Sequence, residues 1–320
     1  MERALITGIS GFVGSHLAEH LLSETDWHVA GTVFGDESNI SHLRERLELY
    51  PAELSRLEVV VEIINRVRPD YIFHLAAQPL PSLSRRDPWG TLQVNIRLQL
   101  NVLEAVVRLG LESRVLVVGS GEEYGLVSPE ELPIDEDTPL RPLNPYAVSK
   151  IAQDFLGLQY HLSHGVYAVR VRPFNHIGPR QRLGFVAPDF ARQIAEVEAG
   201  LRPPVVYVGN LDIYRDFSDV RDVVRAYRLA LTHGEPGQVY NIGSGRAYAV
   251  RELLEGLIAL TGLDIEVRVD PDRVRPSEVP RLVADVSRFR QRTGWEPRIP
   301  LEQSLSDVLN EWRARVRAST

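Results

Sequence analysis

The first fourteen residues constrain the fold more than any other stretch of the chain. A short apolar run, residues 3–7, leads directly into the glycine-spaced segment 8–14, and leucines then recur at helical spacing up to about residue 23. In such a strand–turn–helix unit, the first glycine permits the tight turn, the second admits a pyrophosphate and the third lets helix and strand pack closely. The helix N-terminus then offers unpaired N–H groups to phosphates. We therefore predict a dinucleotide site at Gly8, Gly11, Phe12, Val13 and Gly14.

Strand and helix patterns alternate along the first half of the chain. Apolar runs predict strands at 28–33, 47–50, 70–77, 114–118 and 167–171, and amphipathic stretches predict helices at 59–68, 89–109 and 146–164. Regular alternation of this kind predicts an α/β fold with a Rossmann-type, doubly wound parallel sheet.

The pattern changes after Pro173. We expect a loop over 174–180, helices at 186–199 and 219–231, strands at 205–208 and 238–242, and a further helical unit from 243. The strand near 238–242 is expected to return to the main sheet. No linker or repeat separates the parts, so a smaller α/β substrate-binding lobe should be interleaved with the sheet. We assign 1–173 and about 217–243 to the dinucleotide domain, and about 174–216 and 244–320 to the second.

Composition excludes several classes of function. A net charge of -7 leaves no positive excess to neutralise nucleic-acid phosphates. The absence of cysteine excludes thiol catalysis, disulfides and thiolate metal sites. No apolar run approaches the ~18 residues of a membrane span, and the N-terminus enters a strand at once, without room for a signal peptide. We expect a cytoplasmic enzyme without nucleic-acid or membrane partners.

Tyr146 and Lys150 carry the clearest catalytic signal. Lys150 is the only lysine of the chain, which otherwise uses arginine for its cations. Asn144 can cap a helix that begins at Pro145, and this places Tyr146 and Lys150 on one face, one turn apart. The compact ammonium is expected to lower the pKa of the phenol from about 10 toward working pH. A phenol tuned in this way is an acid or base for a carbonyl/alcohol pair.

Two strand ends offer groups to the rest of a dinucleotide. The second strand ends at Phe34 and Asp36, where an acid would hold a ribose hydroxyl and a basic group a 2′-phosphate. No arginine is present there, so we favour NAD(H) and keep NADP(H) as the alternative. Near the third strand, Glu53 beside Leu54 either reaches an adenine amine or is an ordinary solvated carboxylate.

The fourth strand and the one that follows it end in small or polar residues. Leu75, Ala76 and Ala77 would let backbone lie against a cofactor, whereas His74 is expected to be a satisfied core histidine. The next strand ends in Ser120 and Glu122, at the edge where open parallel sheets bind ligands. Ser120 could share a substrate oxygen with Tyr146. Glu122 could act as an acid or base, and we expect one of the two adjacent glutamates to be an ordinary solvated turn residue.

Two arginines of the second lobe suit a diphosphate. Arg215 and Arg275 are forked donors that match phosphate and ribose oxygens, although most other arginines should form surface pairs. His161 and His164 have metal-ligand spacing, but no third ligand accompanies them, so we expect no metal site.

Gly8-x-x-Gly11-x-x-Gly14 and Tyr146-x-x-x-Lys150 together resemble the extended short-chain dehydrogenase/reductase family. The resemblance covers the whole chain. The segments 174–179, 184–186, 208–212, 215–222 and 275–280 are similar to those of its nucleotide-sugar enzymes, in the GDP-mannose branch. The resemblance implies a homodimer, a GDP-sugar substrate and an NAD(P)-dependent oxidoreductase.

The same resemblance implies roles for individual residues. Ser120, Tyr146 and Lys150 become the catalytic set, with Glu122 as the base if the enzyme dehydrates. Asn95 becomes a cofactor-binding residue. The positions matching substrate contacts are Asn175, Val186, Asn210, Arg215, Arg275 and Glu278. We add the hypothesis that Asp189 binds the N1–H and N2–H edge of guanine.

The implied reaction is reduction of the C4 ketone of a GDP-4-keto-6-deoxyhexose by NAD(P)H. The main alternative is 4,6-dehydration of GDP-mannose with Glu122 as base. More distant alternatives are a UDP- or dTDP-sugar epimerase or dehydratase of the same family, and a nucleotide-sensing module without turnover.

Overall fold

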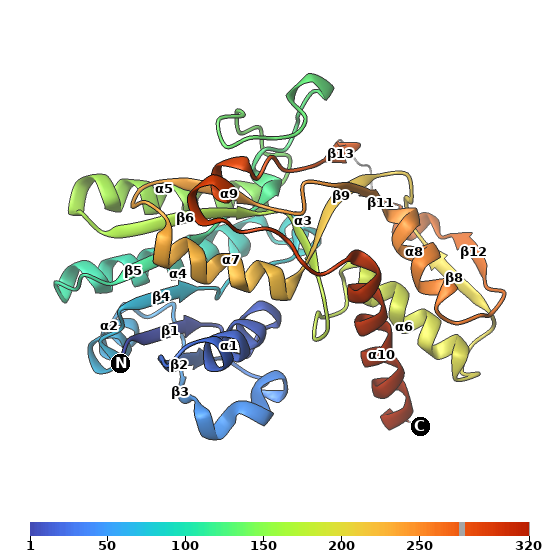
Figure 1. Cartoon of the computed structure of the whole chain (residues 1–320), viewed down its shortest axis with the longest axis horizontal. Helices are drawn as coiled ribbons and strands as arrows, with labels where there is room; N and C mark the ends of the chain where they lie inside the picture. The colour runs from blue at the N-terminus through green and yellow to red at the C-terminus, as the bar shows by residue number, and fades with distance from the viewer. Residues whose placement is uncertain (275–278, 320) are drawn as a thin grey trace.

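The computed structural model describes residues 1–274 and 279–319, in a larger and a smaller lobe (Figure 1). Within these residues, seven parallel strands form the main sheet in the order β10-β6-β5-β4-β1-β2-β3. The strands are β1 (Arg3–Thr7), β2 (His28–Val33), β3 (Glu48–Pro51), β4 (Tyr71–His74), β5 (Arg114–Val118), β6 (Tyr167–Pro173) and β10 (Val239–Ile242). The doubly wound parallel sheet is confirmed, and so is the late strand that returns to its edge.

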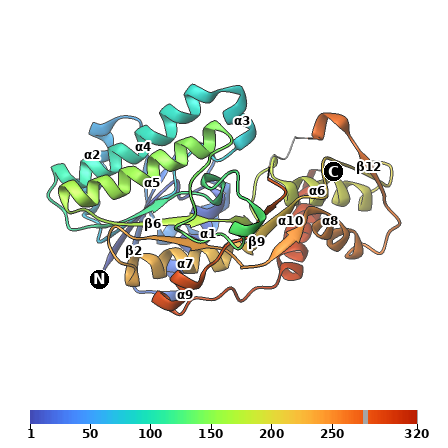
Figure 2. The same ribbon diagram turned by 90° about the horizontal axis from the view of Figure 1, so that it is seen from above.

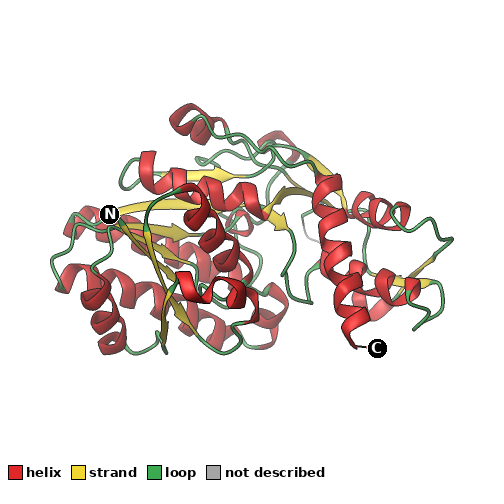
Figure 3. Ribbon diagram, turned by 60° about the horizontal axis from the view of Figure 1, so that its bottom comes forward, coloured by secondary structure: helices red, strands yellow, loops and turns green. Residues whose placement is uncertain are grey.

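Helices cover both faces of this sheet (Figure 3). One face carries α1 (Phe12–Glu24), α7 (Val220–His233) and α9 (Ser287–Thr293), and the other carries α2 (Leu57–Val67), α4 (Pro88–Arg108) and α5 (Pro145–His164). Ile6 belongs to the first apolar core and its neighbour Leu5 to the second. Because successive strand residues point to opposite faces, a sheet buried on both sides needs the continuous apolar runs seen in the sequence.

The smaller lobe packs its helices around a third apolar core. Its helices are α6 (Val186–Glu198), α8 (Val250–Ala259) and α10 (Leu301–Ser319), beside a short sheet of β8 (Val205–Val208) and β12 (Glu266–Val269). A second small sheet centres on β9 (Tyr214–Asp219), which pairs with β7 (Asn175–Ile177), β11 (Ala247–Ala249) and β13 (Arg281–Leu282). The remaining short elements are α3 (Pro81–Arg86) and the 3₁₀-helices η1 (Ser38–Arg46), η2 (Gly121–Glu123), η3 (Pro129–Glu131) and η4 (Pro271–Arg273).

Two local predictions were wrong. Residues 174–180 were expected to be a loop, but Asn175–Ile177 pairs in parallel with 217–219, because β9 offers its free edge there. The segment after Gly243 enters β11 before a helix begins at Val250. Both errors concern short strands whose partners are distant in the sequence.

The chain passes from the sheet to the smaller lobe directly after β6. It returns through β9 and α7 to the edge strand β10. The carboxyl ends of the central strands therefore face the junction of the two lobes (Figure 1). In open parallel sheets this edge is where ligands bind.

Candidate active site

The start of α5 places the tyrosine and the lysine as the sequence predicted. The Asn144 side chain accepts a hydrogen bond from the Ala147 N–H at 2.8 Å, and Pro145 occupies the first helical position. Tyr146 is 9% exposed and Lys150 is 5% exposed. The Lys150 Nζ lies 5.9 Å from the centroid of the Tyr146 ring. One helical turn thus brings both groups to the same buried place.

The expected fall in the pKa of Tyr146 is not found. Burial raises the pKa of this phenol, and the hydrogen bond with Ser120 acts in the opposite direction. The Lys150 ammonium donates to the carbonyl oxygen of Val118 at 2.9 Å. Since it lies over the ring rather than at the phenol oxygen, it does not offset the loss of hydration. Burial in turn lowers the pKa of Lys150 to about 8, with Glu123 acting against this shift.

Ser120 caps the short 3₁₀-helix η2 and is brought to Tyr146 by this turn. Its Oγ accepts from the Glu122 N–H at 3.2 Å, while Glu123 Oε1 accepts from the Ser120 N–H at 2.7 Å. This reciprocal pair is a capping box, and it holds Ser120 just beyond the end of β5. The predicted Ser120, Tyr146 and Lys150 set therefore comes together in the structure.

Neither adjacent glutamate is an ordinary solvated turn residue, so that expectation was wrong. Glu122 is half-buried and accepts a hydrogen bond from Asn144 Nδ2 at 3.2 Å. It also acts electrostatically on Arg215 of β9, whose pKa is lowered by burial and raised by Glu122. Glu123 is fully buried. At this edge of the sheet, the Glu122 carboxylate therefore lies toward the lobe junction, and the Glu123 carboxylate lies beneath the Ser120 turn.

The N-terminal loop has the shape that a pyrophosphate requires. Gly8 has a φ of +70°, and a Cβ there would lie 3.1 Å from Ala76 Cα. A Cβ on Gly14 would lie only 2.3 Å from the carbonyl oxygen of Gly8. Gly11 caps α1 without any side-chain hydrogen bond, so the first turn keeps backbone N–H groups for an anion. These residues fit a dinucleotide.

Thr7 organises the neighbouring strand end, and the sequence did not single it out. Its Oγ1 accepts from the N–H groups of Leu75 and Ala76 at 3.0 and 3.1 Å, and it lies 2.9 Å from His74 Nδ1. The hydroxyl proton must therefore go to His74 Nδ1, which leaves the proton of the neutral ring on Nε2. Burial lowers the pKa of His74 to about 3.

His74 is a core histidine, as predicted, but only half of its ring is satisfied. It is buried beside the catalytic lysine, and its Nε2 has no hydrogen-bond partner among the described residues. An unpaired buried N–H is uncommon and fits a place that lies against a ligand. Ala77 follows on this half-buried loop.

Asn95 lies behind the cofactor loop. It is fully buried, its Oδ1 accepts from the Gln78 N–H at 2.7 Å, and its Nδ2 donates to Gln78 O and Ser149 Oγ. These contacts join the loop after β4 to α5. Asn95 thus shapes this loop, and the cofactor contact implied by the resemblance stays a prediction.

The residues predicted for the adenosine end lie at the β2–β3 edge, away from the catalytic set. Phe34 is 80% exposed. Asp36 accepts from the Ser38 N–H and hydroxyl at 2.9 and 2.8 Å, which closes a turn. Glu53 is exposed with its Oε1 on the Ser55 hydroxyl, and Leu54 is buried. None of these contacts decides between NAD(H) and NADP(H).

The predicted substrate residues are spread over the smaller lobe. Asn175 is exposed on β7, and Val186 is half-buried at the start of α6. Asp189 Oδ1 accepts from the Gly184 N–H at 3.0 Å, and Asn210 Oδ1 accepts from the Asp212 N–H at 2.9 Å. Among the described members, only Arg215 is coupled to the catalytic edge, through Glu122. Arg275 and Glu278 lie outside the described residues.

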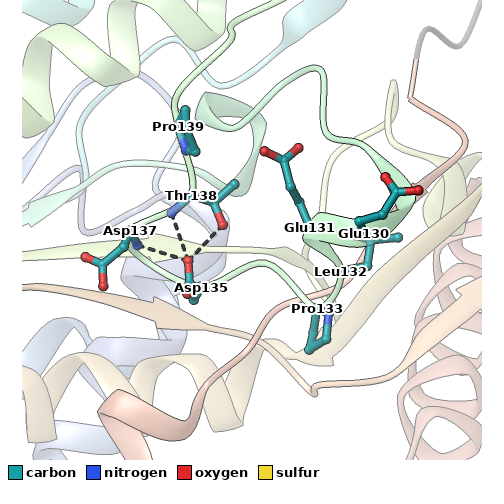
Figure 4. A pocket seen from close by; sticks show the side chains of 8 residues that line it. All are labelled: Glu130, Glu131, Leu132, Pro133, Asp135, Asp137, Thr138 and Pro139. Carbon is teal, nitrogen blue, oxygen red and sulfur yellow. Dashed lines mark hydrogen bonds between the residues drawn. The ribbon is translucent and has the colours of Figure 1, made fainter.

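A separate cavity of about 320 Å³ lies in the loop excursion that follows η2 (Figure 4). It is lined by Glu130, Glu131, Leu132, Pro133, Asp135, Asp137, Thr138 and Pro139. Asp135 Oδ1 accepts three hydrogen bonds from its own turn, and Glu131 is paired with Arg141. Glu131 and Asp135 are thus engaged in local structure, and Asp137 pairs with Arg288 of α9.

In residues 1–274 and 279–319, no helix combines the length and apolar character that a bilayer span requires. Over the same residues, no three histidine, aspartate or glutamate side chains cluster as metal ligands. His161 instead binds the Val166 carbonyl oxygen, and His164 lies against the Tyr160 ring.

The sheet, the glycine turn and the Ser120–Tyr146–Lys150 set define a dinucleotide-dependent oxidoreductase of the short-chain dehydrogenase/reductase type. The family model described as GDP-mannose 4,6 dehydratase matches residues 5–308, and the chain belongs to this family. The predicted resemblance is therefore confirmed.

Two individual relatives match this chain over nearly all of their own length. GDP-6-deoxy-D-mannose reductase of Pseudomonas aeruginosa is 40% identical over 99% of this chain and 99% of its own. GDP-mannose 4,6-dehydratase of Yersinia enterocolitica is 32% identical over 97% of this chain and 93% of its own.

Solved structures show the same fold. The structure of RMD from P. aeruginosa complexed with NADPH has a TM-score of 0.87 at 37% identity, and the match covers 98% of this chain and all of that one. UDP-glucose 4-epimerase of Thermus thermophilus in complex with NAD has a TM-score of 0.85 at 29% identity, covering 97% and 99%.

Proposed function

We propose that this protein reduces the C4 ketone of a GDP-4-keto-6-deoxyhexose with NADH or NADPH. The observation that carries the proposal is the buried Tyr146 phenol, which is hydrogen-bonded to Ser120 and lies one helical turn from Lys150. Ketone reduction needs a proton donor at this place, whereas alcohol oxidation needs a base. The 40% identity to a GDP-6-deoxy-D-mannose reductase over 99% of the chain also supports ketone reduction.

Each member of the catalytic set has one task. Tyr146 donates its proton to the carbonyl oxygen as negative charge develops there. Ser120 donates a second hydrogen bond to that oxygen, in the manner of an oxyanion hole. Lys150 keeps a compact positive charge in the site, 5.9 Å from the centroid of the Tyr146 ring. The dinucleotide, when bound at the Gly8–Gly14 loop, supplies the hydride.

Arg215 is the best-supported residue for the GDP moiety. It lies on β9 at the lobe junction, and Glu122 acts on it electrostatically. Among the described residues, its side chain donates only to the adjacent Tyr214 carbonyl oxygen. A guanidinium with free donors suits the diphosphate. Asn175, Val186, Asn210, Arg275 and Glu278 complete the proposed nucleotide-sugar site. Asp189 remains the proposed guanine contact. Its Oδ1 accepts from the Gly184 N–H, and in the described part of the chain no hydrogen bond engages its Oδ2.

We propose the domain division expected from the sequence. Residues 1–173 and about 217–243 hold the dinucleotide, and about 174–216 and 244–320 hold the nucleotide sugar. The order of β6, β10 and the central strands in one sheet supports this division. Both NADH and NADPH are retained, since related structures are complexed with NADPH or with NAD.

The second candidate is 4,6-dehydration of GDP-mannose, and one observation favours it. Glu122 is half-buried at the catalytic edge, where Asn144 positions it, so it could remove a proton from the sugar. A paired assay separates the two activities. Purified protein receives GDP-4-keto-6-deoxymannose with NADH or NADPH in one tube, and GDP-mannose with catalytic oxidised cofactor in the other. Turnover only in the first supports the reductase, and turnover only in the second overturns it.

We also propose a homodimer formed through α4 and α5. The two helices lie side by side on one face of the molecule (Figure 2). They expose Trp89 (72%), Val94, Phe155 and Leu162 (73%) to solvent. An apolar surface of this kind on two long helices is typical of an interface. Light scattering should give twice the mass of one chain. The Leu162→Glu variant should give the mass of a single chain. A cytoplasmic location stays a prediction, to be tested by cell fractionation.

A further inference from the structure

Tyr124 ends the short turn that holds Ser120. The 3₁₀-helix η2 has Ser120 as its N-cap and Tyr124 as its C-cap, and the Tyr124 N–H donates to the Gly121 carbonyl oxygen at 3.3 Å. The Tyr124 side chain is fully buried. A Cβ on Gly121 would lie 3.0 Å from the Phe174 ring, so the turn is closely packed. A shift of the Tyr124 ring therefore displaces the turn that carries Ser120.

The Tyr124 hydroxyl makes two buried hydrogen bonds, and the chemistry of its partners fixes their directions. Arg172 Nη1 lies 3.0 Å from the phenol oxygen and can only donate, so this oxygen is the acceptor. The hydroxyl proton goes to Asn241 Oδ1 at 2.7 Å. Burial raises the pKa of Tyr124, so the phenol keeps this proton. The tyrosine is thus held between an arginine of β6 and an asparagine of β10.

Asn241 in turn connects the tyrosine to the chain directly after β13. Its Nδ2 donates to the carbonyl oxygens of Ile134 at 2.9 Å and Asp285 at 3.4 Å, which leaves Oδ1 for Tyr124. The backbone of Ile134 is bonded to the same chain segment. Its N–H donates to Val283 O at 2.9 Å, and its carbonyl oxygen accepts from the Asp285 N–H at 2.7 Å. One buried amide therefore joins the catalytic edge of the sheet to this segment.

The far end of this path lies beside Arg215. In the parallel pairing of β13 with β9, Leu282 is the partner of Arg215. The Ala284 N–H donates to Asp216 Oδ2 at 3.1 Å, so the chain after β13 is bonded to β9 a second time. A continuous path of hydrogen bonds and backbone therefore runs from the Ser120 turn to the strand that carries the proposed diphosphate contact.

We propose that Tyr124 is a positioning residue: its hydroxyl, held by Asn241, fixes the Ser120 hydroxyl relative to the sugar that Arg215 helps to place. The inference rests on the proposed functions of Ser120 and Arg215 and deepens them. A donor aimed at a developing oxyanion is effective because it is held in place before the reaction. Loosening the turn should therefore lower kcat and leave KM unchanged, since Ser120 strengthens its contact only in the transition state.

A double-mutant cycle tests this role. Tyr124→Phe removes the hydroxyl alone, and kcat should fall about 10-fold because the Ser120 donor is misplaced rather than lost. Ser120→Ala should lower kcat by about 100-fold. In the double variant, kcat should equal that of Ser120→Ala, since Tyr124 acts through Ser120. Tyr240→Phe also removes one buried hydroxyl, which accepts from the Glu235 N–H at 3.1 Å. It is the matched control and should leave kcat unchanged in both backgrounds.

Losses that multiply in the double variant overturn the proposal, and so does wild-type kcat in a Tyr124→Phe protein that circular dichroism shows to be folded. Should Tyr124→Phe not fold, Asn241→Ser removes the acceptor and should show the same dependence on Ser120. The wild type first shows which substrate of the paired assay it turns over, and the cycle is run on that substrate. Inactivity toward the keto sugar therefore counts against the proposed function, whereas multiplied losses count against the role of Tyr124.

Discussion

Lys150 Nζ donates a hydrogen bond to the backbone carbonyl of Val118 at 2.9 Å, which ties α5 to the end of β5 just before the Ser120 turn. The ammonium therefore has a structural partner on the sheet as well as a place over the Tyr146 ring. This geometry depends on a compact cation that can enter a buried site. It explains why one lysine persists in a chain that otherwise uses arginine.

Replacing Lys150 by arginine should abolish most activity although the charge is kept. The guanidinium is planar and wider, and it cannot occupy the buried position between Val118 O and the phenol ring without displacing one of them. We expect kcat to fall by roughly 100-fold or more. Steady-state assays with saturating cofactor test this, and circular dichroism checks folding. Wild-type kcat in a folded Lys150→Arg protein would show that charge alone suffices.

Tyr146→Phe should lower kcat by about 10²–10⁴-fold, because the proton donor to the ketone is lost. Dinucleotide binding should be unchanged, since the glycine loop is untouched. Fluorescence titration with NADPH measures binding, and cofactor consumption measures turnover. Tyr207→Phe, on strand β8 of the smaller lobe, is the matched control and should behave as wild type. Undiminished turnover in Tyr146→Phe would refute the proposed proton donor.

Arg215→Ala should weaken GDP binding by about 10- to 100-fold, the range for a lost charge-assisted hydrogen bond. Calorimetric titration with GDP alone measures this without catalysis. Arg246→Ala is a suitable control, because Arg246 is exposed and lies against the Tyr248 ring. Equal GDP affinity in the two variants would remove Arg215 from the proposed diphosphate site.

Stability should decrease in mild acid because of a buried histidine between the lobes. His16 Nε2 lies 2.9 Å from the Pro179 carbonyl oxygen, and its Nδ1 lies 2.7 Å from Arg180 Nη2. Nε2 must donate and Nδ1 must accept, so the ring is neutral. Burial, followed by the charge of Arg180, lowers the pKa of His16 from 6.5 to about 4.

The unfolded chain therefore binds more protons than the folded one between pH 6.5 and 4. The contribution of His16 to the free energy of unfolding, up to about 3 kcal/mol, is fully present above pH 6.5 and is lost as the pH falls toward 4. His20 and His74 act in the same direction. Thermal melts across this range should show a smaller decline for His16→Gln than for the control His42→Gln at an exposed site. Identical pH slopes would contradict this account.

Much of the fold was predictable because its signals are local. The strands at 114–118 and 205–208 have the predicted bounds, and α5 begins at the predicted cap. The periodicity of apolar residues and the capping chemistry of Asn144 act within a few residues, so the sequence displays them directly. The short strand β7 was missed because its pairing with β9 depends on residues some forty positions away.

The catalytic set of the site was predictable for the same reason. Tyr146 and Lys150 sit one helical turn apart, and Ser120 ends a strand, so local spacing placed all three. The raised pKa of Tyr146 was not predictable, because it depends on burial by tertiary packing. Glu123 and Arg172 were missed for a related reason. A buried charge can be recognised only from its partners, although Asp154, four residues after Lys150, was an available signal.

Deuterium tracing tests the central claim most directly. The protein is incubated with GDP-4-keto-6-deoxymannose and a nicotinamide cofactor deuterated at the transferable position, and the product is examined by NMR. A C4-ketone reductase transfers the label from the cofactor to C4 of the sugar, with stoichiometric oxidation of the cofactor. That is the result we predict. A sugar product without deuterium at C4, or a cofactor that is not consumed while GDP-mannose is dehydrated, would contradict the account.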